Sequence, residues 1–142
     1  MRSECTQAGV VFLLVQPFSK LRLSGIAGWL VPNRGLIQQT LRHKTNDHFW
    51  FTFFHEAAHL LLHSRKDVFI DGETLKGDAK EEEEANQWAA NFLGPQTELQ
   101  RFIASDSFSV SAISDFAEQV GVAPGIVVGQ LKREKYFRGA RR

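Results

Sequence analysis

The chain has 142 residues, of which 43% are hydrophobic and 23% charged, and its formal net charge is +1. This length suits a single domain with a substantial core, and the near-neutral balance gives no electrostatic reason for the whole chain to bind nucleic acid or a membrane. The single cysteine, Cys5, excludes an internal disulfide framework, and without a secretory signal or an apolar run of roughly 18 residues we expect a cytoplasmic protein.

Strands are predicted in the first part of the chain. Val10–Val15 is a continuous aliphatic run that predicts a buried strand, which the chain enters almost at once, as a piece of a longer protein would. Residues 26–31 and 36–41 flank the turn-forming sequence PNRG, which predicts an antiparallel hairpin. We therefore expect a three-stranded antiparallel sheet.

A helix rich in aromatic residues is predicted next. Thr45 or Asn46 can cap a helix that runs from Asp47 to about His63. Its aromatic residues make it apolar nearly all round, which favours a place in the core; they are Phe49, Trp50, Phe51, Phe53 and Phe54. A short strand over residues 67–70 is predicted to follow.

Helices account for the rest of the predicted fold. Asp78 stands three residues before Glu81, a capping-box spacing, and predicts a helix that ends at Gly94-Pro95. Pro95 can open the next helix, to about residue 104, and two more are predicted over residues 110–120 and 123–135. Strands first and helices afterwards indicate an α+β fold, with the sheet packed on the buried aromatic helix and a C-terminal helical bundle behind it.

The basic residues of the chain are crowded at its end. A run of this kind is typical of a solvated tail; it consists of Lys132, Arg133, Lys135, Arg138, Arg141 and Arg142. We expect a single domain over residues 1–142, with an ordered core over about 10–136 and a basic tail over 137–142.

The aromatic helix carries the sequence His-Glu-Ala-Ala-His at residues 55–59. On a helix, His55 and His59 lie one turn apart on the same face, so both imidazoles can reach one zinc ion. Glu56 projects about 100° around the axis, where its carboxylate can reach a zinc-bound water and accept its proton. The alternative is two histidines that merely pack in the core, but buried polar residues are costly unless they are used.

A catalytic zinc ion normally takes three protein ligands and keeps one position open. The metzincin spacing would put a third histidine at residue 65, which is Arg65. His63 has drifted about 80° around the helix from His55, so we expect it to donate a hydrogen bond to a ligand or to lie near solvent.

The acidic helix supplies the better third ligand. Glu82 shares one face with residues 85, 86, 89 and 93, which are small or apolar apart from Asn86, so this face should pack inward. We predict Glu82 as the third ligand, with Glu84 as the alternative. Asn86, one turn further on, is suited to hold His59 or Glu82 in orientation.

The segments FWFTFFHEAAHLLLHSRKDVFID and EEEEANQWAANFLGP resemble the ImmA/IrrE family of zinc metallopeptidases, and the resemblance extends from about residue 10 to 136. It implies gluzincin-like ligation, in which His55, His59 and Glu82 hold Zn²⁺ and Glu56 is the general acid and base. It also implies a helix-turn-helix repressor as substrate, in stress, phage or toxin–antitoxin regulation, and a fused or partner DNA-binding domain. Trp88 and Gly94 depart from the family's usual residues.

Two other functions fit parts of the sequence. Residues 114–134 have the cadence of a helix-turn-helix, but the second helix offers only Gln130 to read bases. The chain could instead be a catalytically silent zinc-binding sensor or interaction domain. The presence of Glu56 argues against that, because a purely structural site would favour four closed ligands.

Substrate capture can also be predicted from the order of the elements. Residues 36–41 end shortly before the motif helix, so we expect an edge strand along the cleft, where the amide of Gln38 or Gln39 pairs with an extended peptide. The residue that stabilises the oxyanion is open among Tyr136, His48 and His63.

Overall fold

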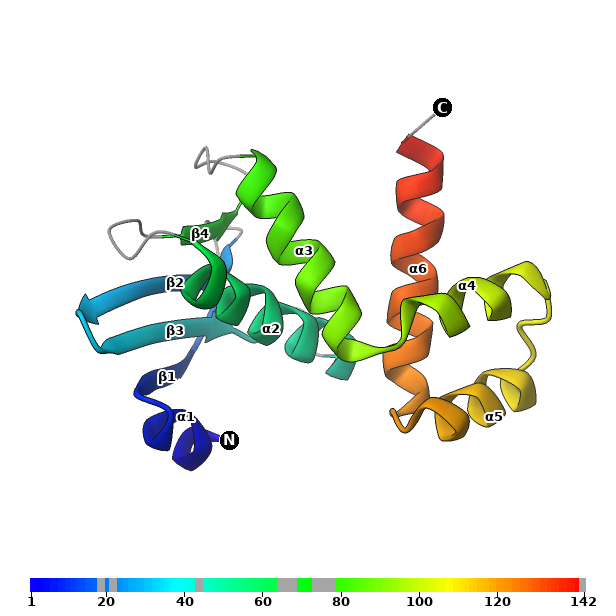
Figure 1. Cartoon of the computed structure of the whole chain (residues 1–142), viewed down its shortest axis with the longest axis horizontal. Helices are drawn as coiled ribbons and strands as arrows, with labels where there is room; N and C mark the ends of the chain where they lie inside the picture. The colour runs from blue at the N-terminus through cyan, green and yellow to red at the C-terminus, as the bar shows by residue number, and fades with distance from the viewer. Residues whose placement is uncertain (18–19, 21–22, 43–44, 64–68, 73–78, 141–142) are drawn as a thin grey trace.

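The computed structural model describes residues 1–17, 20, 23–42, 45–63, 69–72 and 79–140 (Figure 1). The elements in chain order are α1 (Arg2–Gln7), β1 (Val10–Val15), β2 (Leu23–Val31), β3 (Arg34–Thr40), α2 (Asn46–Leu62), β4 (Phe69–Gly72), α3 (Ala79–Leu93), α4 (Gln96–Ala104), α5 (Val110–Val120) and α6 (Pro124–Ala140). The α+β class is therefore confirmed, although α1 precedes the strands and β4 lies between α2 and α3.

The four strands form one mixed sheet in the order β1-β3-β2-β4. The predicted hairpin is present, with β2 antiparallel to β3 and Ile26 opposite Gln38. The prediction of a purely antiparallel sheet is wrong, because β1 runs parallel to β3. A turn sequence predicts the pairing of two consecutive strands in a hairpin, but β1 pairs with a strand that is not its neighbour in the sequence, and no local pattern encodes that pairing.

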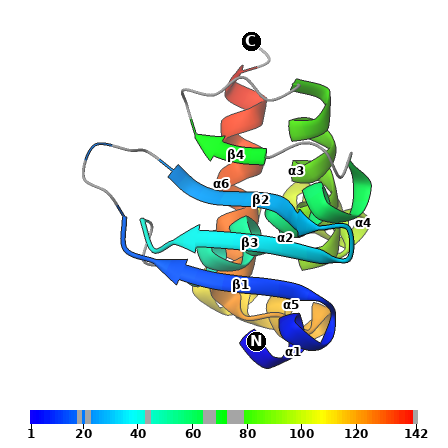
Figure 2. The same ribbon diagram turned by 90° about the vertical axis from the view of Figure 1, so that its left-hand side faces the viewer.

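The expectation that residues 36–41 form an edge strand is also wrong. β3 lies inside the sheet, paired with β1 on one side and β2 on the other, so Gln38 and Gln39 cannot offer free amides to a peptide. The side chain of Gln39 points inward instead, where its Nε2 donates to the Phe49 carbonyl at 2.9 Å. The edges are β1 and β4 (Figure 2).

The N-terminal segment differs from the prediction in two ways. It begins with the helix α1, whose six residues are too few to show a helical period, and Cys5 from this helix is buried in the core. β1 is an edge strand rather than a fully buried one: Phe12 is buried, whereas Leu13 and Leu14 are 42% and 37% exposed. An aliphatic run therefore overstated the burial of β1.

α2 packs on one face of the sheet, behind the strands in Figure 2. Thr45 is its N-cap residue, one of the two predicted. The core between the two layers consists of Cys5, Phe12, Ala27, Ile37 and Leu60. α3 covers the other side of α2 through Ala85, Ala89 and Leu93, which are buried as predicted. The aromatic residues of α2 are only partly buried, although the helix packs against the sheet, α3 and α6.

The C-terminal helices form a second apolar cluster, made of Leu99, Phe116, Ala117, Val127 and Leu131. α5 has the predicted bounds, Pro95 is the N-cap of α4 rather than its first residue, and α6 continues past residue 135 to Ala140. The bundle joins the first layer where α6 meets α2. Gly129 allows this approach, since a Cβ there would lie 2.5 Å from the Cβ of Asp47.

Some predictions fall on residues that the structure does not describe: the cap Asp78, the start of the strand predicted over 67–70, and residues 141–142 of the expected tail. β4 begins at Phe69. Among the helices of the described ranges, none is long and apolar enough to cross a membrane.

Candidate metal centre

The two histidines of the motif lie one turn apart on α2 and are almost fully buried, at 3% and 1% exposure for His55 and His59. Their Nε2 atoms are 3.1 Å apart. The i, i+4 spacing on a helix therefore brings both nitrogens to one point, as predicted.

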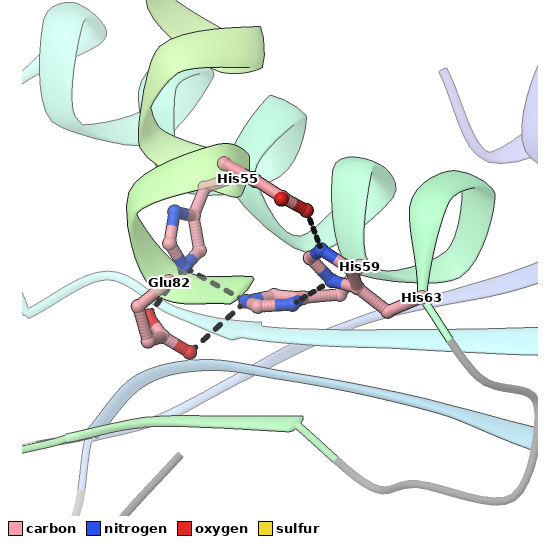
Figure 3. A network of polar contacts seen from close by, with 5 residues as sticks. His55, His59, His63 and Glu82 are labelled. Carbon is pink, nitrogen blue, oxygen red and sulfur yellow. Dashed lines mark hydrogen bonds and ion pairs between the residues drawn. The ribbon is translucent and has the colours of Figure 1, made fainter. Parts of the chain in front are cut away.

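Glu82 reaches this point from α3 (Figure 3). Its Oε2 lies 3.2 Å from the Nε2 of His55, and its Oε1 lies 3.1 Å from the Nε2 of His59. Hydrogen bonds from His55 and His59 lower the pKa of Glu82 to about 2, although burial acts in the opposite direction. The carboxylate is therefore ionised at neutral pH.

These three side chains fit a divalent metal ion. Their ligand atoms all lie within 4.8 Å of one another, and the closest pairs are 3.1 to 3.2 Å apart. A tetrahedral zinc ion with bonds of roughly 2.0–2.1 Å holds its ligand atoms about 3.3 Å apart. Two imidazoles and one carboxylate are also a donor set that zinc uses in catalytic sites. His55, His59 and Glu82 can thus hold the ion with little rearrangement.

A second carboxylate, that of Glu84, is linked to His59 through the imidazole of His63. The Nδ1 of His63 lies 2.9 Å from the Nδ1 of His59, and the Nε2 of His63 lies 3.1 Å from the Oε2 of Glu84. If His59 keeps its Nε2 lone pair for a metal, its Nδ1–H donates to His63, whose Nε2–H donates to Glu84. Every member of this chain then has a partner, and His59 is held in the ligating tautomer.

His63 therefore contacts a candidate ligand, which was one of its two predicted positions, but in this tautomer it accepts the hydrogen bond from His59 rather than donating it. Glu84, the alternative third ligand, contacts His63 instead of the convergent nitrogens. Glu82 is therefore the carboxylate that contacts the two convergent histidine nitrogens, whereas Glu84 is separated from them by the imidazole of His63.

Glu56 is fully buried, at 0% exposure. Its carboxylate lies against Gly25 of β2, where an added Cβ would come within 2.5 Å of Oε1 and 2.8 Å of Cγ. Gly25 thus makes the space that Glu56 occupies beside the histidine pair. Sequence reasoning missed this role, because the sequence does not show that β2 passes next to α2.

Of the other candidates for the site, the side chains of Asn86 and His48 are described by the structure. Asn86 lines a cavity with Phe51 one turn along α3 from Glu82, and its role in orienting His59 or Glu82 stays a prediction. His48 lies near the start of α2, with its Nε2 3.9 Å from Asp47. The side chain of Tyr136 lies outside the described residues. Arg133, counted in the basic tail, is partly buried and lines the same cavity as Asn86.

Comparison with known families agrees with this geometry. A family model described as Peptidase M78, the IrrE N-terminal-like domain, matches residues 41–131, which is more than half of the chain and runs from the segment before α2 into α6. No curated protein matches the chain. The matched region contains the histidine pair, Glu56, Glu82 and the His63–Glu84 contact, and it supports a metallopeptidase-like function.

Proposed function

The chain belongs to the Peptidase M78 family, and we propose that it is a zinc-dependent endopeptidase that cuts a specific protein substrate. One observation carries this proposal. Two imidazole nitrogens from α2 and a carboxylate from α3 lie within 4.8 Å of one another. The helix α2 also carries the buried carboxyl group of Glu56.

Glu56 distinguishes an enzyme from a silent zinc-binding domain. A structural site closes with four ligands, whereas among the described residues three donors converge, and a second carboxyl group, that of Glu56, is buried on the same helix as the two histidines. Burying a carboxyl group is costly. A catalytic role for Glu56 would explain why a carboxyl group is buried there. A sensor or interaction domain would have no use for a buried carboxyl group at this position.

The chemistry divides between the ion and the chain. Bound zinc would supply a water of pKa near 7 and polarise the scissile carbonyl. Glu56 accepts a proton from the attacking water and returns it to the amide nitrogen as the peptide bond breaks, so one carboxylate serves as base and then as acid. Gly25 keeps the space in which that carboxylate sits.

The proposed substrate is a helix-turn-helix transcriptional repressor, in a cytoplasmic stress, phage or toxin–antitoxin system. This part rests on the resemblance of the motif helices to the ImmA/IrrE family. Direct DNA binding is the weaker candidate, because Gln130, the one base-reading side chain predicted in α6, is buried and donates to the Ala90 carbonyl at 3.2 Å.

The test uses purified chain with its metal content measured, incubated with a repressor encoded next to its gene and, separately, with casein. The matched control is Glu56→Gln, which keeps the size of the side chain but cannot take up a proton. We expect about one zinc per chain in both proteins, one or a few cuts in the repressor by the native chain, and none by the variant.

The proposal fails if Glu56→Gln cuts as fast as the native chain, or if the native chain binds no zinc. Digestion of casein at many sites would leave the peptidase in place and overturn the specific substrate.

A further inference from the structure

Arg133 of α6 is a partly buried cation in the junction between α6 and α2. Its guanidinium carbon lies 3.4 Å from the centre of the Phe51 ring. Burial lowers the pKa of Arg133 to about 10, and the negative charge of Asp47 opposes that shift. The guanidinium therefore stays charged at neutral pH, with an aromatic face on one side.

The hydrogen-bonding groups of this side chain have no partner among the described residues. A guanidinium has five N–H donors in a planar fork, yet within the described ranges no hydrogen bond or ion pair reaches Arg133. Asp47 acts on it only through space. A partly buried arginine in this state is suited to a planar, bidentate acceptor from outside the chain.

A cavity of about 340 Å³ opens beside Arg133, between α2, α3, α4 and α6. Its wall is rich in amide side chains, namely Asn86, Gln87, Gln96, Gln100 and Gln130. Gln96 and Gln130 already donate to the Ala90 carbonyl, which fixes two of these amides in the wall. The volume is at the lower end for ligand sites, so it suits one side chain with some water.

The cavity lies next to the metal centre. The Phe51 ring under Arg133 stacks with the His55 imidazole, with centroids 6.1 Å apart and planes at 27°. Asn86, in the cavity wall, stands one turn after Glu82 on α3. The guanidinium carbon of Arg133 is 3.4 Å from the Phe51 centroid, which is 6.1 Å from the His55 centroid, so it lies no more than 9.5 Å from the centre of the His55 ring. An extended peptide advances roughly 3.3 Å per residue, so about three residues of substrate can span this separation.

We propose that this cavity, the Arg133 pocket, receives the side-chain carboxylate of an aspartate or glutamate of the substrate, within about three residues of the cut bond. The inference rests on the proposed peptidase function and adds the class of sequence that is recognised. A single negative charge suits the pocket better than a doubly charged phosphate, since Glu83 and Glu134 also line it. Arg133 and the wall amides of Asn86 and Gln87 together supply the donors.

The first test measures binding without cleavage. Zinc-loaded Glu56→Gln protein, labelled with ¹⁵N, is titrated with N-acetyl-glutamate N-methylamide, with the glutamine counterpart and with inorganic phosphate. The readout is the Arg133 Nε–H signal, assigned by its loss in Arg133→Lys. We expect the glutamate probe to shift this signal at about tenfold lower concentration than the glutamine probe, because the hydrogen bonds to a carboxylate are charge-assisted.

The second test measures cleavage. The native chain, Arg133→Met and the matched control Arg101→Met, an exposed arginine on α4, each digest a mixed peptide library whose cut sites are read by mass spectrometry. We expect acidic residues enriched at one position within three residues of the cut, for the native chain and Arg101→Met but not for Arg133→Met.

The outcomes of the two tests distinguish a failure of the Arg133 pocket from a failure of the proposed peptidase function. If the native chain cuts no peptide, the peptidase proposal fails and the probe titration alone decides the pocket. Equal shifts with the glutamate and glutamine probes, or no shift, overturn the pocket, and so does a response to phosphate at lower concentration than to glutamate. Cutting without an acidic preference overturns it while leaving the peptidase intact.

Discussion

The two hydrophobic clusters of the described residues differ in how many polar side chains are buried beside them. The core around the sheet, α2 and α3 buries polar side chains, among them Gln39, His55, Glu56 and His59. The core of α4, α5 and α6 is an apolar cluster around Phe116, although Gln130 of α6 is also buried. Because buried polar groups cost stability unless they are hydrogen-bonded or used, we infer that the first region holds the proposed metal chemistry, whereas the apolar cluster around Phe116 is a scaffold.

The largest effect that we expect comes from removing one of the three proposed metal ligands in the first region. Glu82→Ala leaves two donors at the convergence point, so zinc affinity should fall by at least about 10³-fold, or about 4 kcal/mol. Competition with a chromophoric chelator measures this loss directly.

The matched control is Glu81→Ala, which removes the same charge from the first turn of α3 without touching the histidines. It should change zinc affinity less than twofold. Equal losses in both variants would mean that the charge of the helix terminus, not ligation by Glu82, holds the ion.

In the second region, truncating a buried aromatic side chain should lower the free energy of unfolding and leave zinc affinity unchanged. Phe116 is buried and stacks with Phe102 at a centroid distance of 4.5 Å. Phe116→Ala should lower the free energy of unfolding by about 3 kcal/mol through the cavity that it leaves. Urea unfolding measures this, and zinc affinity below the transition should stay within twofold of the native value. A large loss of zinc affinity in the folded variant would show that the two cores are coupled.

The same contrast explains what could be predicted from the sequence. The helices of the second region follow from local signals: α5 has the predicted bounds, and its N-cap Ser109 accepts a hydrogen bond from the Ala112 amide at 3.1 Å. The first region depends on pairing between distant segments. Its hairpin was predictable from the turn at Pro32–Asn33, but the parallel partner of β1 and the central place of β3 were not.

The metal centre was predictable as far as helical periodicity reaches. The spacing of His55 and His59 defines one face of α2, and the inward face of α3 singled out Glu82. What the sequence withheld depends on how the elements pack together. Glu84 meets His63 because α3 crosses α2, and Gly25 meets Glu56 because β2 passes beside them.

An intermediate effect is expected at the contact between Gly25 and Glu56. Gly25→Ala would put a Cβ 2.5 Å from Oε1, so the carboxylate must move. We expect peptide cleavage to fall by about 10²-fold, within the range for a misplaced general base, while zinc remains bound. The measurements are kcat/KM and zinc content on the same preparation.

Gly125→Ala is its control in the second region, since, apart from its own neighbours in α6, no atom of the described residues lies within 4 Å of a Cβ at that position. It should keep full activity and gain up to about 1 kcal/mol of stability, because alanine favours the helix. Native activity in Gly25→Ala would show that the Glu56 carboxylate can move away from the added Cβ without loss of function. The close approach of Gly25 to Glu56 would then not be needed for catalysis.

The smallest effect expected is at Glu84, which acts on the metal only through His63 and His59. Partners of ligating histidines typically contribute 10–100-fold to metal affinity. Glu84→Gln keeps an oxygen that can accept from His63 but loses the charge, so zinc affinity should fall by about tenfold, and Glu84→Ala should lower it further. Lys80→Met is the control, because the exposed Lys80 only approaches Glu84 at 3.8 Å and such surface pairs contribute little. If Glu84→Ala binds zinc as tightly as the native chain, the contact with His63 does not orient His59, and the polar core would owe its metal affinity to the three converging donors alone.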